Sequence, residues 1–242
     1  RLHDLMSFIE ENYEIVHSRA YSRRKNCHSS ISYRQFEYPS GNQSQPIKAT
    51  FFIKDKNNVR YIVDVCPVDG LNIELQVSFD PAISSMSDFI QPCTEYFKSK
   101  GVLKNAKFDA NMGFIATEKT AWEDIVLTEE QHELLERNIV RYIENIALYK
   151  EKGLPTSRGC LITGPPGTGK TLCCKTLMSQ VDCTFIYITS DHIDNRGQIA
   201  ALYELARSLS PTIVVVEDID TLGAVDRQQM PGDHPLLGEF LN

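Results

Sequence analysis

The segment Gly164–Thr171 reads Gly-Pro-Pro-Gly-Thr-Gly-Lys-Thr, which fits the phosphate-binding pattern of Gly, four residues, Gly, Lys and Ser or Thr. Glycines let the backbone turn tightly enough to aim its N–H groups at an anion, and the positive N-terminal end of a following helix favours the same charge. In this pattern Lys170 reaches the β- and γ-phosphates of a nucleotide, and the Thr171 hydroxyl ligates Mg²⁺. The alternative interpretation is a Gly- and Pro-rich surface turn before a helix.

The sequence around this loop alternates between strand and helix patterns. A short apolar run at 160–163 precedes the loop, and residues 172–181 suit a helix because they lack Gly and Pro. Two β-rich segments follow, at 183–189 and 212–216, with a helix around 199–208 between them. This order predicts an α/β phosphate-loop NTPase core with a parallel sheet.

Glu217 and Asp218 come directly after the last β-rich segment. Ligands of open α/β sheets bind beyond the carboxyl ends of the parallel strands, so both carboxylates are expected beside the phosphate loop. Mg²⁺ prefers oxygen ligands, and an attacking water needs a carboxylate to orient it. The pair is therefore a candidate for both tasks, and the alternative is a solvated acidic turn.

A small α+β domain is expected at 1–117, before a nucleotide-binding core at 118–242. An amphipathic helix is predicted over 1–17, and a second helix over 81–100 in which Pro92 causes a kink or an early end. Turn residues separate four β-rich segments, which predict an antiparallel meander: 31–38, 47–54, 60–66 and 73–79. No catalytic constellation is recognisable in this domain.

A basic cluster follows the first predicted helix, with Arg19, Arg23, Arg24 and Lys25 around Tyr21. Such a cluster can touch nucleic acid or lipid headgroups, but in an acidic chain we interpret it as a solvated linker. The formal net charge is -7, from 25 Lys and Arg against 32 Asp and Glu, which argues against non-specific nucleic-acid binding.

The seven cysteines form no Cys-x-x-Cys pair and are odd in number, which favours a reducing, cytoplasmic compartment over a disulfide framework or a zinc site. No apolar run approaches the length of a membrane span. The first residue is Arg1 rather than Met, so an upstream targeting segment stays compatible with the sequence.

A connector over 101–121 contains a possible short strand near 113–116 and leads to Trp122–Leu127. A long helix is then predicted from Thr128 to about Lys152. Thr128 can cap it, Gln131 is placed for a capping box, and Gly153 ends it.

From Trp122 to Asn242 the chain resembles the AAA family of ATPases. Four blocks carry the resemblance: 122–126, 158–171, 211–220 and 237–242. It implies a hexameric ring that couples ATP hydrolysis to the remodelling of a protein client, with the preceding domain choosing the client or partner. The cofactors implied are ATP and Mg²⁺.

The resemblance also assigns roles to residues. Lys170, Glu217 and Asp218 are the catalytic candidates, with Glu217 associated with Mg²⁺ together with Thr171 and Asp218 polarising the water. Asp124–Val126 would border the adenine. The residues assigned to nucleotide binding are Asp124, Ile125, Val126, Gly164, Pro165, Pro166, Gly167, Thr168, Gly169, Lys170, Thr171 and Leu172.

This sequence departs from the family pattern at three places. Glu217 precedes Asp218, whereas the usual order is Asp then Glu; the reversed order resembles the subgroup of the mitochondrial inner-membrane AAA chaperone of respiratory complex assembly. Because Asp218 is one methylene shorter than Glu, slow hydrolysis is predicted. The loop 190–198 lacks the aromatic-apolar-glycine triplet that grips a threaded polypeptide, and Asn195-Arg196-Gly197 stands in its place. The segments that carry the sensor asparagine, the arginine finger and the helical lid are missing, so we interpret the chain as a fragment with an incomplete ATPase sheet.

Two other functions remain compatible with these residues. One is a nucleotide-dependent binding or switch module with little hydrolysis, and the other is a phosphate-loop kinase that acts on a small molecule.

Overall fold

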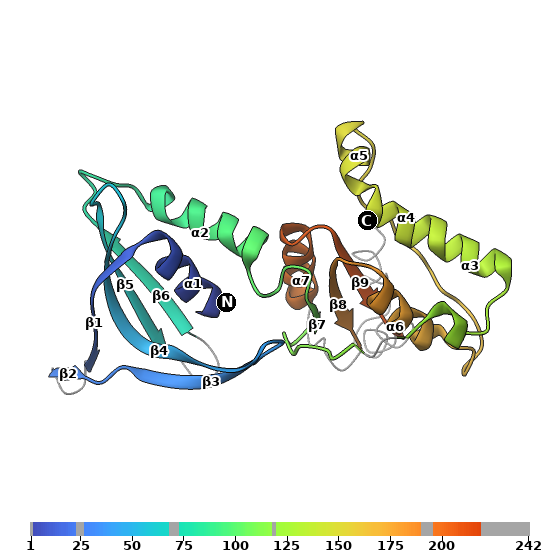
Figure 1. Ribbon diagram of the computed structural model, residues 1–242, viewed down its shortest axis with the longest axis horizontal. Coiled ribbons are helices and arrows are strands. Elements are labelled where there is room, and N and C mark those ends of the chain that lie inside the picture. The colour runs from blue at the N-terminus through green and yellow to red at the C-terminus, as the bar shows by residue number, and fades with distance from the viewer. Residues whose placement is uncertain (1, 23–26, 68–72, 118–119, 190–195, 219–242) are drawn as a thin grey trace, which may run out of the picture. The chain divides into compact units, whose positions relative to one another are not determined.

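The computed structural model describes residues 2–22, 27–67, 73–117, 120–189 and 196–218 (Figure 1). Its contacts divide the chain into two compact units, Arg1–Lys104 and Asn105–Asn242. The sequence-based boundary lies later, after residue 117. The difference arises because strand β7 (Lys107–Asp109), in the region expected to be a connector, pairs with a strand of the second unit.

The first unit is built on an antiparallel sheet with the strand order β2-β1-β4-β5-β6, and β3 pairs with the first half of β4. The meander expected from residues 31–79 is confirmed, although β4 starts earlier than predicted and runs for 14 residues. The strands are β1 (Glu14–Ser22), β2 (Cys27–Ser29), β3 (Ser32–Tyr38), β4 (Gly41–Lys54), β5 (Arg60–Pro67) and β6 (Ile73–Phe79).

The helix predicted over 1–17 extends further than the helix in the structure. Helix α1 (Leu2–Asn12) ends before β1, which pairs with β4 and places the guanidinium of Arg19 4.8 Å from the centre of the Phe52 ring. Arg19 therefore belongs to the sheet, and its interpretation as part of a linker is wrong. The physical reason is that pairing with β4 overrides the helical pattern of the local sequence. Arg23–Lys25 lie outside the described residues.

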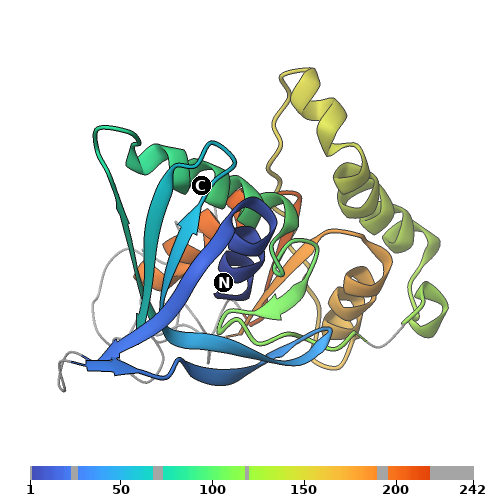
Figure 2. The same ribbon diagram turned by 60° about the vertical axis from the view of Figure 1, so that its left-hand side comes forward.

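Helices α1 and α2 (Met86–Lys100) pack on one face of this curved sheet (Figure 2). Helix α2 starts later than predicted and continues across Pro92 to Lys100. The core is aromatic: the rings of Phe8 and Phe89 meet edge to face at 5.7 Å, and Tyr61 lies 5.6 Å from Phe89. These contacts join both helices to the sheet.

The end of α2 is held against α1 by a buried carboxylate. The Asp4 side chain is 4% exposed, and its Oδ1 accepts a hydrogen bond of 2.8 Å from the Val102 N–H. Between these partners, a Cβ atom added to Gly101 would lie 2.4 Å from the Phe97 carbonyl oxygen and 3.1 Å from Asp4 Oδ2. Only glycine fits this close approach.

Gly101→Ala is therefore expected to destabilise the first unit by about 1–3 kcal/mol, because the added methyl group meets backbone rather than a side chain that can turn away. Urea unfolding of the full chain, with hydrogen exchange to locate the loss in residues 1–104, measures the effect. Gly159→Ala is the matched control, because a methyl group added at Gly159 would have nothing within 4 Å of it. Equal stability of the two variants would contradict the prediction.

The second unit contains a three-stranded parallel sheet with the order β7-β8-β9. Strand β8 is Thr184–Ile188 and β9 is Thr212–Val216. Helices α6 (Lys170–Gln180) and α7 (Arg196–Ser208) lie on opposite sides of this sheet (Figure 1). The predicted order of helix and strand after the phosphate loop is confirmed, and the parallel pairing agrees with an α/β core.

The prediction of a strand at 160–163, before the phosphate loop, is wrong. Residues 154–165 have no regular secondary structure, and the Leu161 side chain is 78% exposed. A strand needs a neighbour for its backbone hydrogen bonds, and none of the described strands pairs with this run.

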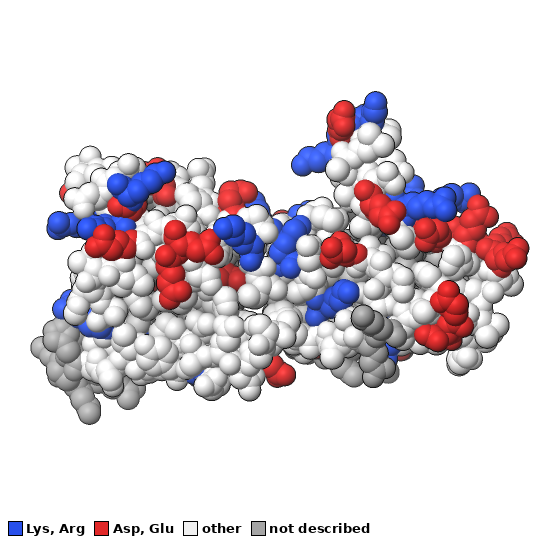
Figure 3. Space-filling model, viewed as in Figure 1, with Lys and Arg blue, Asp and Glu red and all other residues white. Residues whose placement is uncertain are grey.

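The helical region predicted at 128–152 is interrupted. It consists of α3 (Glu129–Leu135), a π-helical turn (Glu136–Val140), α4 (Arg141–Glu144) and α5 (Ile146–Glu151). The predicted capping box is confirmed: the Gln131 N–H donates to Thr128 Oγ1, and the Thr128 N–H donates to Gln131 Oε1. Acidic side chains gather over α3 (Figure 3), including Glu129 and Glu130 in its first turn, where they complement the helix dipole.

Candidate nucleotide-binding site

The phosphate loop adopts backbone conformations that require glycine. Gly167 and Gly169 have φ angles of 77° and 84°, and a Cβ atom at Gly164 would lie 3.1 Å from Thr168 Oγ1. Helix α6 begins immediately afterwards, at Lys170. The loop thus presents backbone at the positive end of a helix of 11 residues, as an anion site requires.

The ammonium group of Lys170 lies against the loop itself. Its Nζ donates hydrogen bonds of 2.9 Å to the carbonyl oxygens of Gly164 and Pro165, and Thr168 Oγ1 donates to the same Pro165 oxygen at 2.9 Å. A cation held by two carbonyl oxygens is available to phosphate oxygens, which are stronger acceptors because they carry charge. The residues of the loop therefore fit a nucleotide phosphate chain.

Glu217 stands at the carboxyl end of β9 and faces α6. Its N–H donates to the Ile188 carbonyl at 2.9 Å. Burial, followed by the neighbouring Cys173 and Glu217, raises the pKa of the Cys174 thiol to about 12. Cys174 follows Thr171 by three residues and so lies one turn further along the same helix face.

The Thr171 hydroxyl lies in the first turn of α6, and the Glu217 carboxylate follows β9, which packs against the same helix. They offer the oxygen ligands that Mg²⁺ prefers, and this ion commonly keeps several waters and substrate phosphates in its shell. Among the described residues, no group of three or more His, Cys, Asp or Glu side chains could hold a metal alone. The donor set fits an ion shared with a nucleotide.

Asp218 follows with a φ angle of 49°, in the left-handed region that Asp tolerates better than most residues. At this φ angle Asp218 leaves the extended conformation of β9, so it does not continue the alternation of the strand. The next residues, from 219 onwards, including Leu237–Asn242, lie outside the described part of the chain.

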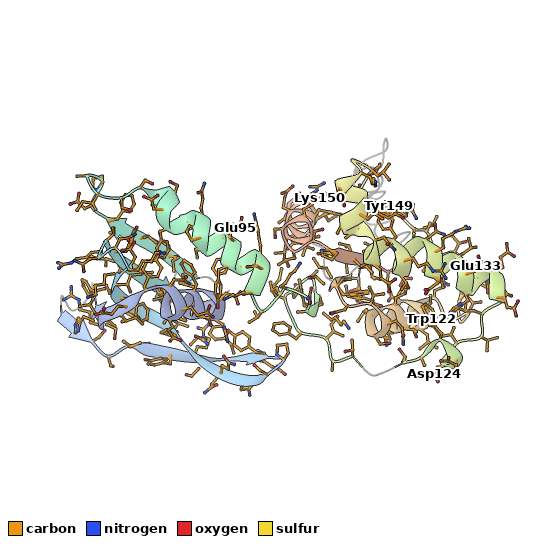
Figure 4. All side chains as sticks on the ribbon, turned by 45° about the horizontal axis from the view of Figure 1, so that its top comes forward. Glu95, Trp122, Asp124, Glu133, Tyr149 and Lys150 are labelled. Carbon is orange, nitrogen blue, oxygen red and sulfur yellow. The ribbon has the colours of Figure 1, made fainter. Side chains whose placement is uncertain are left out.

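The residues predicted to border the adenine lie close to the phosphate loop at one point. A Cβ atom at Gly169 would be 4.0 Å from Ile125 Cγ2, and Ile125 packs with the core of α6. Val126 is 99% exposed. Figure 4 shows Trp122 and Asp124 on the short turn (Trp122–Asp124) beside α6, where Asp124 accepts a hydrogen bond from the Ala121 N–H at 2.8 Å. Their contact with an adenine stays a prediction.

The structure places Ile125 and Lys170 against the loop, with Thr171 in the first turn of α6 and Glu217 at the end of β9, all within the second unit. Leu172, also assigned to nucleotide binding, is 36% exposed in the first turn of α6, and its contact with a nucleotide stays a prediction. Of the loop at 190–198, residues 190–195 lie outside the described residues, and α7 begins at Arg196.

One residue of the site escaped the sequence analysis. Tyr187, on β8, packs on the same face as α6, and burial together with the nearby Glu217 carboxylate raises the pKa of its hydroxyl. Alternation along β8 puts Tyr187 and Phe185 on one face, but only the register with β9 reveals that Glu217 is its neighbour.

The parallel sheet, the glycine-rich loop at the start of α6 and the acid at the end of β9 define a phosphate-loop nucleotide-binding protein. Residues 160–241 match the family model of the ATPase family associated with various cellular activities (AAA). The part of the chain that carries the phosphate loop, α6 and β9 is therefore an AAA domain.

Its relatives include proteasome-associated proteins. It is 26% identical over 191 residues to the proteasome-activating nucleotidase of Pyrococcus abyssi, a match that covers 74% of this chain and 45% of the relative. It is 36% identical over 104 residues to the probable 26S proteasome regulatory subunit 10B of Caenorhabditis elegans, covering 40% and 25% of the two chains. The chain thus spans less than half the length of these relatives. None of the described helices is long and apolar enough to cross a membrane.

Proposed function

We propose that this protein binds ATP with Mg²⁺, hydrolyses it, and uses the reaction to remodel a protein or a protein complex. The observation that carries the proposal is the glycine-rich loop at the N-terminal end of α6, with the Lys170 ammonium against it and Glu217 at the end of β9. The similarity to proteasome-activating nucleotidases supports action on proteins rather than transfer of phosphate to a small molecule.

Each residue has a role that follows from its position. The N–H groups of the loop and the Lys170 ammonium bind the phosphates, and Thr171 and Glu217 hold Mg²⁺, Glu217 partly through water. The ion supplies charge neutralisation at the phosphates when it is bound. Asp218 accepts a hydrogen bond from the attacking water and orients it, and its short side chain makes hydrolysis slow.

The assembly we propose is a homo-oligomeric ring, with six subunits as the AAA resemblance implies, in which a neighbour supplies an arginine to the site. The first unit would select the client. Phosphate release from ATP, measured as the concentration of the protein is raised, tests this proposal, with Lys170→Ala as the blank. Specific activity that climbs with protein concentration is expected, because sites are completed between subunits. Activity equal to the blank at every concentration would contradict it.

A nucleotide-dependent switch with little hydrolysis is the second candidate, and the shorter acid at Asp218 favours it. Asp218→Asn separates the two functions. In an ATPase this variant is expected to lose about 10²–10³-fold in turnover while it still binds ATP, because it removes the group that orients the water. A phosphate-release rate that is the same in Asp218→Asn and the wild type, with ATP binding retained, would instead identify the switch.

A further inference from the structure

Tyr187 and Glu217 are diagonal neighbours on adjacent parallel strands. Tyr187 pairs in register with Val215, and Glu217 follows Val215 by two residues on the same face. Diagonal neighbours of this kind are within reach of long aromatic side chains. The Tyr187 side chain is therefore within reach of the Glu217 carboxylate, and burial together with this carboxylate raises the pKa of the Tyr187 hydroxyl.

The backbone of Tyr187 is fixed from both sides of β8. On one side Asp109 of β7 pairs with it in register, and the Ala110 N–H donates to the Tyr187 carbonyl oxygen at 3.1 Å. On the other side the Glu217 N–H donates to the carbonyl of Ile188, the next residue of β8, at 2.9 Å. The Tyr187 ring and the Glu217 carboxylate are therefore both attached to backbone that is fixed by the pairing of β8 with its neighbours.

Packing restricts the ring as well. Tyr187 is partly buried and packs against the cluster that contains Cys173 and Leu177 of α6 and Phe185 of β8. A ring enclosed in this way has few alternative rotamers, so its hydroxyl is delivered to one place. Preorganisation of this kind allows a residue that does not itself bind the metal to hold a metal ligand in position.

The chemistry of the pair leaves one carboxylate oxygen for the ion. A phenol donates a single hydrogen bond, whereas a carboxylate has two oxygens that accept. Once Tyr187 holds one oxygen of Glu217, the other can face Thr171 and accept from water in the shell of Mg²⁺.

We propose that Tyr187 is a positioning residue that orients the Glu217 carboxylate for Mg²⁺ and thereby sets how tightly this ion binds with ATP. The inference rests on the proposed function of the same site. It assigns to β8 a part in metal binding in addition to its part in the sheet.

Tyr187→Phe tests the inference because it removes the hydroxyl and keeps the ring. Binding of a fluorescent, non-hydrolysable ATP analogue to the full chain is measured while Mg²⁺ is titrated, and again in EDTA. The Mg²⁺ concentration at half-saturation is expected to rise about tenfold, in the range seen when a partner of a metal ligand is removed. Binding in EDTA and the unfolding temperature are expected to stay as in the wild type.

Two controls separate positioning from packing. Tyr203→Phe removes a hydroxyl from a half-buried tyrosine of α7 in the same unit and is expected to leave the Mg²⁺ titration unchanged. In a Glu217→Gln background, Tyr187→Phe is expected to shift the titration by less than about twofold, because Tyr187 acts through the carboxylate.

The outcomes are distinct. If the wild type shows Mg²⁺-dependent binding and Tyr187→Phe has the same half-saturation, the inference is wrong and the proposed function stands. The inference is also wrong if the variant weakens binding equally in EDTA, since Tyr187 then acts through packing. A wild-type chain that binds no nucleotide would overturn the proposed function, and this inference with it.

Discussion

Lys170→Ala is expected to lower ATP turnover by about 10²–10³-fold and to weaken ATP binding by about 10–100-fold. The ammonium is the one cation of the phosphate loop, and in the structure it already lies inside the loop, 2.9 Å from the carbonyl oxygens of Gly164 and Pro165. A hydrogen bond to a charged group contributes about 1.5–3 kcal/mol, which corresponds to the loss in affinity. The larger loss in turnover arises because charge on the phosphates grows as the bond to the leaving group breaks.

Phosphate release and equilibrium binding of a fluorescent ATP analogue measure the two effects. Lys175→Ala is the matched control, because Lys175 is an exposed lysine of the same helix, beyond the turn that meets the phosphates. It is expected to retain wild-type turnover and binding. Equal losses of turnover and binding in Lys170→Ala and Lys175→Ala would contradict the role proposed for Lys170. The losses would then arise from the net charge of α6.

The phosphate loop could be predicted from sequence because its chemistry is local. Gly167 and Gly169 adopt positive φ angles that few other residues tolerate, and Lys170 and Thr171 are fixed to them by the first turn of α6. The same holds for the capping box of Thr128 and Gln131, whose hydrogen bonds span three residues. In both cases every partner lies within one turn of chain.

Predictions that depend on a distant partner were less successful. The run at 160–163 has the apolar character of a strand, but a strand forms only beside a neighbour, and Leu161 is instead exposed. Conversely, residues 14–17 belong to the predicted helix but form the start of β1 (Glu14–Ser22), because β4 lies next to them. The pattern of apolar side chains indicates which residues are buried. Tertiary pairing decides whether those residues form a helix or a strand.

Tyr187 illustrates the same limit within the site. Nothing in the sequence of β8 distinguishes its tyrosine from a core aromatic residue. Its relation to Glu217 depends on the parallel register of β8 with β9, in which Tyr187 stands opposite Val215. A shift of the register by one residue would place Tyr187 and Glu217 on opposite faces, so the contact could be found only from the paired strands.

Phe89→Ala is expected to destabilise the first unit by about 3–5 kcal/mol, which approaches the whole stability of a small domain. The side chain is fully buried, and its ring contacts Phe8 of α1, Tyr13 and Tyr61 of β5 at centre distances of 5.6–5.7 Å. Its removal leaves a cavity where α1, α2 and the sheet meet. Phe89 is the one fully buried aromatic side chain of α2, so the neighbouring side chains can do little to fill the space that it leaves.

Urea unfolding followed by hydrogen exchange in residues 1–104 measures this loss, and binding of the ATP analogue reports the second unit in the same sample. Tyr33→Ala is the control, because it removes an aromatic ring that is 59% exposed on β3 of the same unit, and it is expected to change stability by less than about 1 kcal/mol. As the two units are compact on their own, Phe89→Ala is expected to open the first at lower urea while nucleotide binding persists. Simultaneous loss of both signals would mean that the units unfold as one, and that the first contributes to the stability of the nucleotide site.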